Sequence, residues 1–266
     1  MEGSPADAAE RVAFASHRAG VVEVCWTGPD GMLRATAGVP LQHSGQPTLA
    51  LPWSHESQAR EMAAAAAVGW VLSDGRLAQR SWEPLLALGR FELTEDTTGE
   101  VFADELLGQE LRKYPPSRAY ADTPLLRNEN WWYLPRLLLV LAPDAVVPVG
   151  ARTGSEDAVL AVVDQGGGLG VDTVAVTDPG AAPRATSLSG RPALPPGEAL
   201  LFGHDFSVPD LERWTWQTTT GRWDGTRLDV VARSGQRELG PAPGLRERLR
   251  RHRELERGCR AALRGR

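Results

Sequence analysis

The side chains with the most chemistry lie in one short polar stretch, which runs from Ser54 to Arg60 with the sequence SHESQAR. Hydroxyls and backbone N–H groups at the start of a helix bind anions, and an arginine one turn further on can donate two hydrogen bonds to a phosphate. The stretch therefore offers an anion site. The other interpretation is a surface helix capped by Ser54 or Ser57, and the spacing alone favours it.

A second candidate is Arg34, which lies in the mostly apolar segment MLRATAGVPL, residues 32–41. A cation in such a strand either pairs with a neighbouring acid at a sheet edge or faces a ligand. Taken alone, Arg34 favours the edge pair.

Other motifs give weaker indications. The pair His204-Asp205 ends an apolar segment and could serve as a general acid or an axial haem ligand, although a local turn hydrogen bond is the commoner role. The cluster Trp131-Trp132-Tyr133 could stack on a planar ligand but more often packs in a core. The five histidines are scattered without metal-ligand spacing, so no metal site is predicted. Lys113 is the one lysine, so a Schiff-base mechanism would have to use it.

Composition limits the function classes. The chain has 266 residues, of which 42% are hydrophobic, and a formal net charge of −5. A length of this kind suits one large or two small domains, and the acidic balance argues against a nucleic-acid partner. No apolar run reaches the ~20 residues that span a bilayer, so no membrane association is expected. Two isolated cysteines, Cys25 and Cys259, indicate a reducing, cytoplasmic setting. The scarcity of lysine beside abundant arginine and alanine is typical of a bacterial genome rich in G and C.

The pattern predicts a mainly β chain with a few helices. An Asp30-Gly31 turn indicates a hairpin between the first two strands. Helices are expected at 6–19, 54–67, 102–113 and 244–264, and strands at 21–26, 32–41, 47–53, 68–72, 85–93, 131–141, 159–163, 169–176, 198–202 and 227–232. A segment rich in Pro, Gly and Ala at 142–157 is the expected linker.

The two halves show a weak internal similarity. In the first half, VVEVCW, a turn and LRATAGV precede PTLALPWSHES. In the second half, VLAVVD, a turn and LGVDTVAV precede EALLFGHDFS. The pattern fits a duplicated unit and equally fits two unrelated β-meanders.

The element order over about residues 8–141 resembles the FMN-binding split β-barrel superfamily, the pyridoxamine 5′-phosphate oxidase-like proteins. The resemblance is carried by the strand VVEVCW, the Asp-Gly hairpin, the pattern R-x-T-x-x-V-P-L at 34–41, the polar turn into a helix, and the strand ALGRFELTED. It implies a split barrel in residues 1–142 and a second, degenerate barrel-like half with a C-terminal helix in residues 155–266.

The resemblance also implies a cofactor site. In that family the strand after the first hairpin lies beside the flavin ring and the next polar turn binds the FMN phosphate. The matching positions here are Arg34, Ala35, Thr36 and Val39 for the ring, and Ser54, Ser57, Gln58 and Arg60 for the phosphate. Gln58 stands where the family has a lysine, so Arg60 would supply the charge. Val171-Asp172 takes the place of Arg34 in the second half, which implies a lost second site.

These implications lead to one functional expectation and one alternative. The expectation is an FMN-binding flavoprotein, an oxidoreductase acting on an unknown small molecule, with its site between two barrels of a homodimer or of an intrachain pseudo-dimer. The alternative is a protein of the same fold without turnover, which binds haem or a deazaflavin or serves a structural role. No residue stands out as the catalytic acid or base.

The last segment, residues 241–266, carries nine arginines and three glutamates, a local charge of +6 against −11 for the rest. A charged tail for nucleic acid is one interpretation. However, apolar residues recur at steps of three and four, at Leu245, Leu249, His252, Leu255, Cys259 and Ala262. Such a stripe predicts a helix docked on its own chain or on a dimer mate, with a cost of a few kcal/mol for Leu249→Asp.

Overall fold

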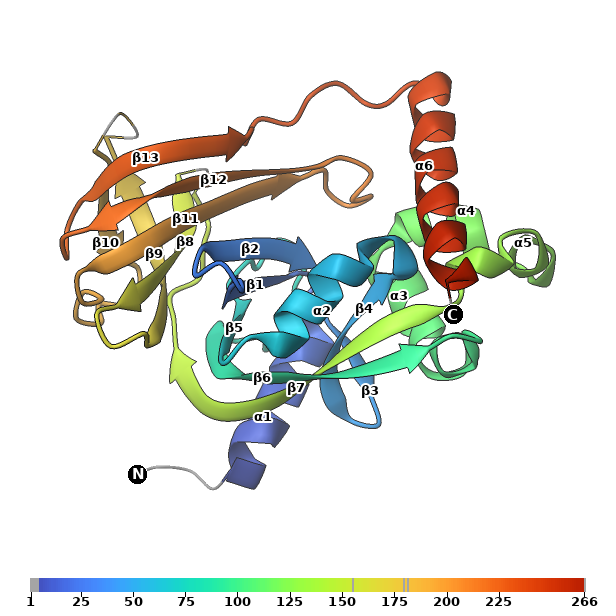
Figure 1. Ribbon diagram of the computed structural model, residues 1–266, viewed down its shortest axis with the longest axis horizontal. Coiled ribbons are helices and arrows are strands. Elements are labelled where there is room, and N and C mark those ends of the chain that lie inside the picture. Colours follow the sequence, from blue (N-terminus) through green and yellow to red (C-terminus); the bar gives the residue numbers. More distant parts are fainter. Residues whose placement is uncertain (1–4, 155, 179, 181, 266) are drawn as a thin grey trace.

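The computed structural model describes residues 5–265 except 155, 179 and 181, and shows two antiparallel sheets with helices around the first of them (Figure 1). The first sheet contains β1 (Val22–Thr27), β2 (Leu33–Gly38), β3 (Leu41–His43), β4 (Gln46–Pro52), β5 (Val68–Leu72), β6 (Leu85–Asp96) and β7 (Arg136–Pro148). The second contains β8 (Asp157–Asp164), β9 (Leu169–Thr177), β10 (Arg184–Ser187), β11 (Gly197–Phe206), β12 (Trp214–Trp223) and β13 (Leu228–Gly235). The expected mainly β class is confirmed.

The helices are α1 (Pro5–Arg18), α2 (Glu56–Ala64), α3 (Leu107–Lys113), α4 (Arg118–Ala121), α5 (Pro124–Glu129) and α6 (Leu245–Arg264). Short 3₁₀ turns lie at η1 (Trp53–His55), η3 (Pro115–Ser117) and η4 (Trp131–Tyr133), and η2 (Phe102–Leu106) is a π-helical turn. Among the described helices, none combines the length and the apolar character needed to cross a membrane.

The first sheet closes into a barrel. Its strand order is β2-β1-β5-β6-β7-β4-β3, so β2 and β3 form opposite edges. Only Val39 and Pro40 separate these two strands in the chain. Since consecutive Cα atoms are ~3.8 Å apart, the edges can be no more than about 11 Å apart at this corner. Lys113 fixes the corner, because its ammonium group donates to the carbonyl oxygens of Pro40 and of Ser16 in α1, both at 2.7 Å.

The second sheet closes as well. Its order is β10-β9-β8-β11-β12-β13, and a bridge between Arg184 and Arg227 joins the edges. Two backbone hydrogen bonds make this junction, from Ala185 to Thr226 and from Leu228 to Pro183. We count β2 and β3 as one bent strand and number each barrel's strands from one to six. Both barrels then have the cyclic order 1-4-5-6-3-2. The internal similarity of the sequence therefore corresponds to a shared topology.

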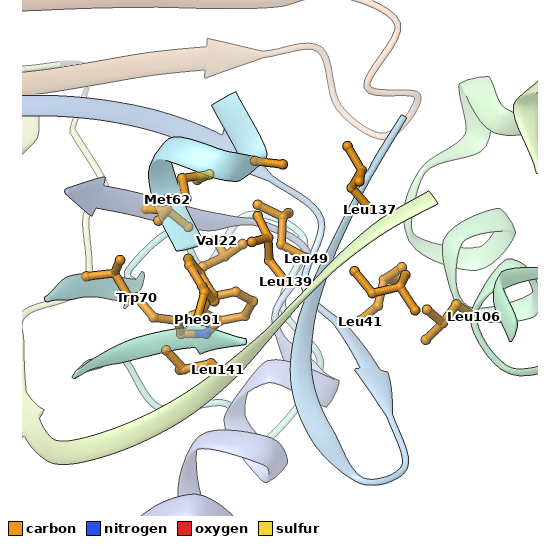
Figure 2. Close-up of a cluster of buried hydrophobic side chains, with 14 of the residues drawn as sticks. Val22, Leu41, Leu49, Met62, Trp70, Phe91, Leu106, Leu137, Leu139 and Leu141 are labelled. Carbon is orange, nitrogen blue, oxygen red and sulfur yellow. The ribbon is translucent and has the colours of Figure 1, made fainter. Parts of the chain in front are cut away.

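Apolar residues alternate along the strands and fill three layers. The first barrel's interior holds large side chains, among them Trp70, Phe91 and Leu139 (Figure 2). Along β8, Ala158, Leu160 and Val162 face the second barrel's interior, while Val159 and Ala161 lie in a layer shared with β1 and β5 of the first barrel. The period of two explains how one strand supplies both layers. The layer between the barrels holds the two halves together.

The C-terminal helix docks on the first barrel rather than on the second. Cys259 is fully buried in the first barrel's core, and Leu255, Ala262 and Leu263 pack against that core. His252 stacks on Tyr120, with ring centroids 5.3 Å apart. The amino-terminal part of the stripe does not dock, since Leu245 is 78% exposed and Leu249 55% exposed. The large cost expected for Leu249→Asp is therefore wrong, and Cys259 is the position that carries the docking.

Two other expectations need correction. Residues 131–133 form the turn η4 rather than the start of a strand, because Pro135 has no N–H to donate and β7 begins only at Arg136. The expected linker at 142–157 is shorter than predicted, since β7 continues to Pro148 and only residues 149–156 connect it to β8. The end of β7, APDAVVP at 142–148, was not recognised from the sequence because its two prolines are unusual in a strand. Strands β10 and β12 and helices α4 and α5 had not been predicted.

Candidate functional site

A cavity of about 500 Å³ lies between the two barrels, and we call it the inter-barrel cavity. The first barrel contributes β1, β2, η1 and α2, and the second contributes β11 and β12. The lining residues are Trp26, Leu33, Arg34, Ala35, Ser54, His55, Ser57, Gln58, Glu61, Leu200, Thr218 and Thr220. The volume is within the range of small-molecule and cofactor sites.

Five of the eight residues expected at a cofactor site meet in this cavity. They are Arg34, Ala35, Ser54, Ser57 and Gln58, which come from β2 and from the polar turn at the start of α2. Thr36, Val39 and Arg60 are not among its lining residues. The strand and the turn are thus brought to one place, although they are about twenty residues apart in the chain.

Arg34 is already engaged by two carboxylates. Its guanidinium donates to Glu61 and, at 2.9 Å, to Asp30 in the hairpin turn. The hydrogen bond to Glu61 raises the pKa of Arg34. Glu61 itself faces the cavity, so the positive charge of Arg34 is neutralised on the side where a ligand would lie.

Arg60 points away from the cavity. It forms ion pairs with Glu56 at 2.9 Å and with Glu95 at 2.6 Å on the outer surface. These two hydrogen bonds raise the pKa of Arg60. A side chain held in this way supplies no charge to the inter-barrel cavity.

His55 is a lining residue that the sequence-based site did not include. Its Nδ1 lies 3.0 Å from the hydroxyl of Ser54. The ring borders the open cavity, yet the surrounding protein desolvates it and, together with the charge of Arg136, lowers its pKa. The imidazole is therefore neutral near pH 7 and can accept a hydrogen bond or bind a metal ion. Its position in the polar stretch was visible in the sequence. Its orientation was not.

A buried ionic cluster lies elsewhere along the junction of the barrels. Glu23 of β1 is fully buried and contacts Arg152, and its carboxylate lies 2.8 Å from Nε2 of His204. Ser73 donates to both carboxylate oxygens of Glu23, and Arg152 donates to Ser73. The cluster thus ties β1 and β5 of the first barrel to the β7–β8 connection and β11 of the second.

Competing effects set the protonation of this cluster. Burial would raise the pKa of Glu23, but the charge and hydrogen bonds of Arg152 and His204 outweigh burial and lower it to about 2. Burial lowers the pKa of His204, which is therefore neutral near pH 7. His204, favoured as a turn residue in the sequence, is instead part of this core, and its Nε2 is not available as an axial ligand.

The residue in the place of Arg34 in the second barrel has a different setting. Asp172 of β9 is buried, accepts a hydrogen bond from the N–H of Thr173 at 2.8 Å and lies 3.7 Å from Arg191. A buried carboxylate at this position would repel an anionic ligand.

No protein-family model and no curated protein sequence matches the chain. Solved structures show partial likeness. A protein of unknown function from Agrobacterium tumefaciens has a TM-score of 0.37 and 19% identity, and the likeness spans 57% of this chain and 60% of that protein. A pyridoxamine 5′-phosphate oxidase-related, FMN-binding protein from Nostoc punctiforme has a TM-score of 0.33 and 14% identity, over 61% of this chain and 93% of that one. A haem-binding protein from Mycobacterium smegmatis has a TM-score of 0.36 and 10% identity, over 98% and 99%. At these scores none of them assigns a ligand to this chain.

Proposed function

We propose that the chain is a flavin-binding protein that holds the flavin ring in the inter-barrel cavity and serves as an oxidoreductase for a small molecule. The observation that carries the proposal is the meeting of Arg34, Ala35, Ser54, Ser57 and Gln58 with β11 and β12 of the second barrel around one cavity. The proposal is supported by the resemblance of the sequence to split-barrel proteins, in which the matching residues contact the cofactor and the flavin lies between barrels. A bound flavin would supply the redox chemistry itself.

The cavity suits the flavin ring. Leu33, Ala35 and Leu200 provide apolar surface from both barrels. Trp26 also lines the cavity and anchors its wall in the first barrel's core.

The cavity does not suit the phosphate of FMN equally well. Arg34 is paired with Glu61 and Asp30, and the carboxylate of Glu61 faces the same space. A phosphate would have to displace Glu61 from Arg34 and then lie beside it. The chain's own residues therefore fit the ring and oppose the phosphate group.

Glu61→Gln is expected to strengthen FMN binding by about fivefold to thirtyfold, because removing one nearby negative charge changes the interaction energy by about 1–2 kcal/mol at a half-exposed site. Riboflavin has the same ring without the phosphate, so its affinity is expected to change by less than twofold. Quenching of flavin fluorescence gives both dissociation constants.

Arg60→Ala is the matched control, since Arg60 lies outside the cavity and neither affinity is expected to change. If wild-type protein binds neither flavin, the proposed function fails. If Glu61→Gln alters riboflavin and FMN equally, the phosphate does not lie near Arg34.

Haem is the second candidate, and His55 favours it. A neutral imidazole whose Nδ1 is held by Ser54 and which borders a partly apolar cavity has the features of an axial ligand. A deazaflavin would occupy the same space as a flavin, and no residue described above separates the two.

A further inference from the structure

A second cavity, of about 700 Å³, opens at one end of the second barrel, and we call it the second-barrel cavity. Its walls include Ala158, Leu201, Gln217 and Thr219 from β8, β11 and β12, and it shares no lining residue with the inter-barrel cavity. Along β12, Gln217 and Thr219 face this cavity while Thr218 and Thr220 face the other, as the alternation of a strand requires.

The cavity exists because the second barrel is not plugged at this end. In the first barrel, α1 precedes the first strand, and its Val12 and Ala15, together with Ala19 directly after it, are buried in the barrel's core. In the second barrel the corresponding segment is the connection from β7 to β8, residues 149–156, whose described residues form no helix. Mouths of β-barrels are recurrent sites for small ligands.

Two arginines at the cavity are already neutralised. Arg76 donates to Asp74 at 2.7 Å and to Asp205 at 2.5 Å. Arg152 contacts Glu23 in the buried ionic cluster. Neither group offers an unbalanced charge to a ligand.

Arg237 differs from them. Its guanidinium lies against the backbone of Gly203, where a Cβ would be 2.7 Å from Cζ. It donates to the backbone carbonyl of Asp157, and it makes no ion pair with a carboxylate of the described residues. Its Nε is buried without a partner there. Burial and the charge of Arg152 lower the pKa of Arg237, and the more distant carboxylates of Glu156, Asp157 and Asp205 offset only part of that effect. A further anion in direct contact with the guanidinium would therefore be stabilising.

His204 adds an unpaired polar atom to the same cavity. The residue is 3% exposed and lines the cavity. Its Nε2 contacts Arg152 and Glu23, but no partner of Nδ1 is found among the described residues. The carboxylates of Glu156 and Glu238 lie at exposed positions of the lining, where water screens them. The other acids of the lining, Asp74 and Asp205, are paired with Arg76, which leaves Arg237 without an ion pair among the described residues at this cavity.

We propose that the second-barrel cavity binds a small organic anion, with its carboxylate or phosphate on Arg237 and its body against Ala158, Val176 and Leu201. The cavity is open in this structure, and its apolar wall lies beside Arg237, which makes no direct ion pair with a described carboxylate. The site is separate from the flavin proposal and does not depend on it.

Isothermal titration calorimetry with hexanoate and with inorganic phosphate tests the proposal. Wild-type protein is expected to bind at least one probe saturably at a single site, and the probe that binds identifies the head group. Arg237→Gln is expected to weaken that binding by about tenfold to a hundredfold, the scale of a lost charge-assisted hydrogen bond. Arg222→Gln, an exposed arginine of β12 outside the cavity, is expected to change it by less than twofold.

Gln217→Trp fills the cavity from β12 and provides a second variant. It is expected to abolish anion binding while leaving flavin binding in place, so failure of this proposal and failure of the flavin proposal are distinguishable. Absence of saturable binding of both probes to wild-type protein overturns the proposal. Wild-type affinity in Arg237→Gln or in Gln217→Trp, with circular dichroism showing a folded protein, overturns it as well.

Discussion

Glu23→Ala is expected to lower the free energy of unfolding by about 3–5 kcal/mol, because it removes the carboxylate that contacts Arg152 directly and leaves this buried cation only the more distant Asp74, at 3.9 Å. Glu23 is fully buried and Arg152 is 5% exposed, so water cannot replace the lost partner. Urea unfolding measures the effect as a lower midpoint with a similar slope. Arg90→Gln is the control, since Arg90 and Asp144 form a 4.0 Å pair with both side chains about two-thirds exposed, and it is expected to cost less than about 0.5 kcal/mol.

The pH dependence of this pair has a defined sign. The pKa of Glu23 is about 2 in the folded chain and 4.5 without the fold. Its stabilising contribution is therefore fully present above pH 4.5 and is lost as the pH falls through about 2.

A loss below 1 kcal/mol for Glu23→Ala at pH 7 would show that the cluster does not hold the barrels together.

Cys259→Asp is expected to destabilise the protein by about 3 kcal/mol or more, because it places an unpaired charge in the core that α6 shares with the first barrel. Cys259 is fully buried, and the neighbouring Gly258 approaches so closely that a Cβ there would lie 2.7 Å from Cβ of Ser54. Leu249→Asp makes the same change on the exposed part of the helix and is expected to cost less than about 0.5 kcal/mol. Thermal unfolding of the two variants compares them directly. Equal melting temperatures for wild type and Cys259→Asp would show that α6 is not docked.

Much of the strand pattern could be read from the sequence, since β1, β5, β8 and β9 are short apolar runs bounded by turn residues. β12 was missed because its sequence, WTWQTTTGRW, has few aliphatic residues. Its successive residues instead line two different cavities in alternation. α1 was recognised from Asp7 as a possible cap and Gly20 as its end, and α6 from its helical spacing. Which barrel α6 covers depends on contacts with η1 and η4 that no local pattern encodes.

The first-barrel part of the site was predictable, and the second-barrel part was not. Arg34 and the Ser54–Gln58 turn carry a motif, whereas Leu200, Thr218 and Thr220 join the cavity only because the two barrels pack together. Two ion pairs could not be predicted from the sequence either. Arg34 and Glu61 are 27 positions apart in the chain, and Arg60 and Glu95 are 35 positions apart. Spacing shows which cations are near a site. It does not show which of them are already neutralised.

The most direct test of the central claim is a riboflavin titration of wild type and of two neighbouring variants on β12. Thr218→Trp fills the inter-barrel cavity, and Gln217→Trp places the same side chain on the opposite face of the strand. Saturable binding is expected for wild type and for Gln217→Trp. Thr218→Trp is expected to weaken it by about a hundredfold or more, because a bulky ring removes the space for the ligand. If the protein binds no flavin but gives a Soret band on addition of haem, and if His55→Ala removes that band, the cavity is a haem site instead. Flavin binding that Thr218→Trp leaves unchanged would contradict the claim that the cavity between the barrels is the cofactor site.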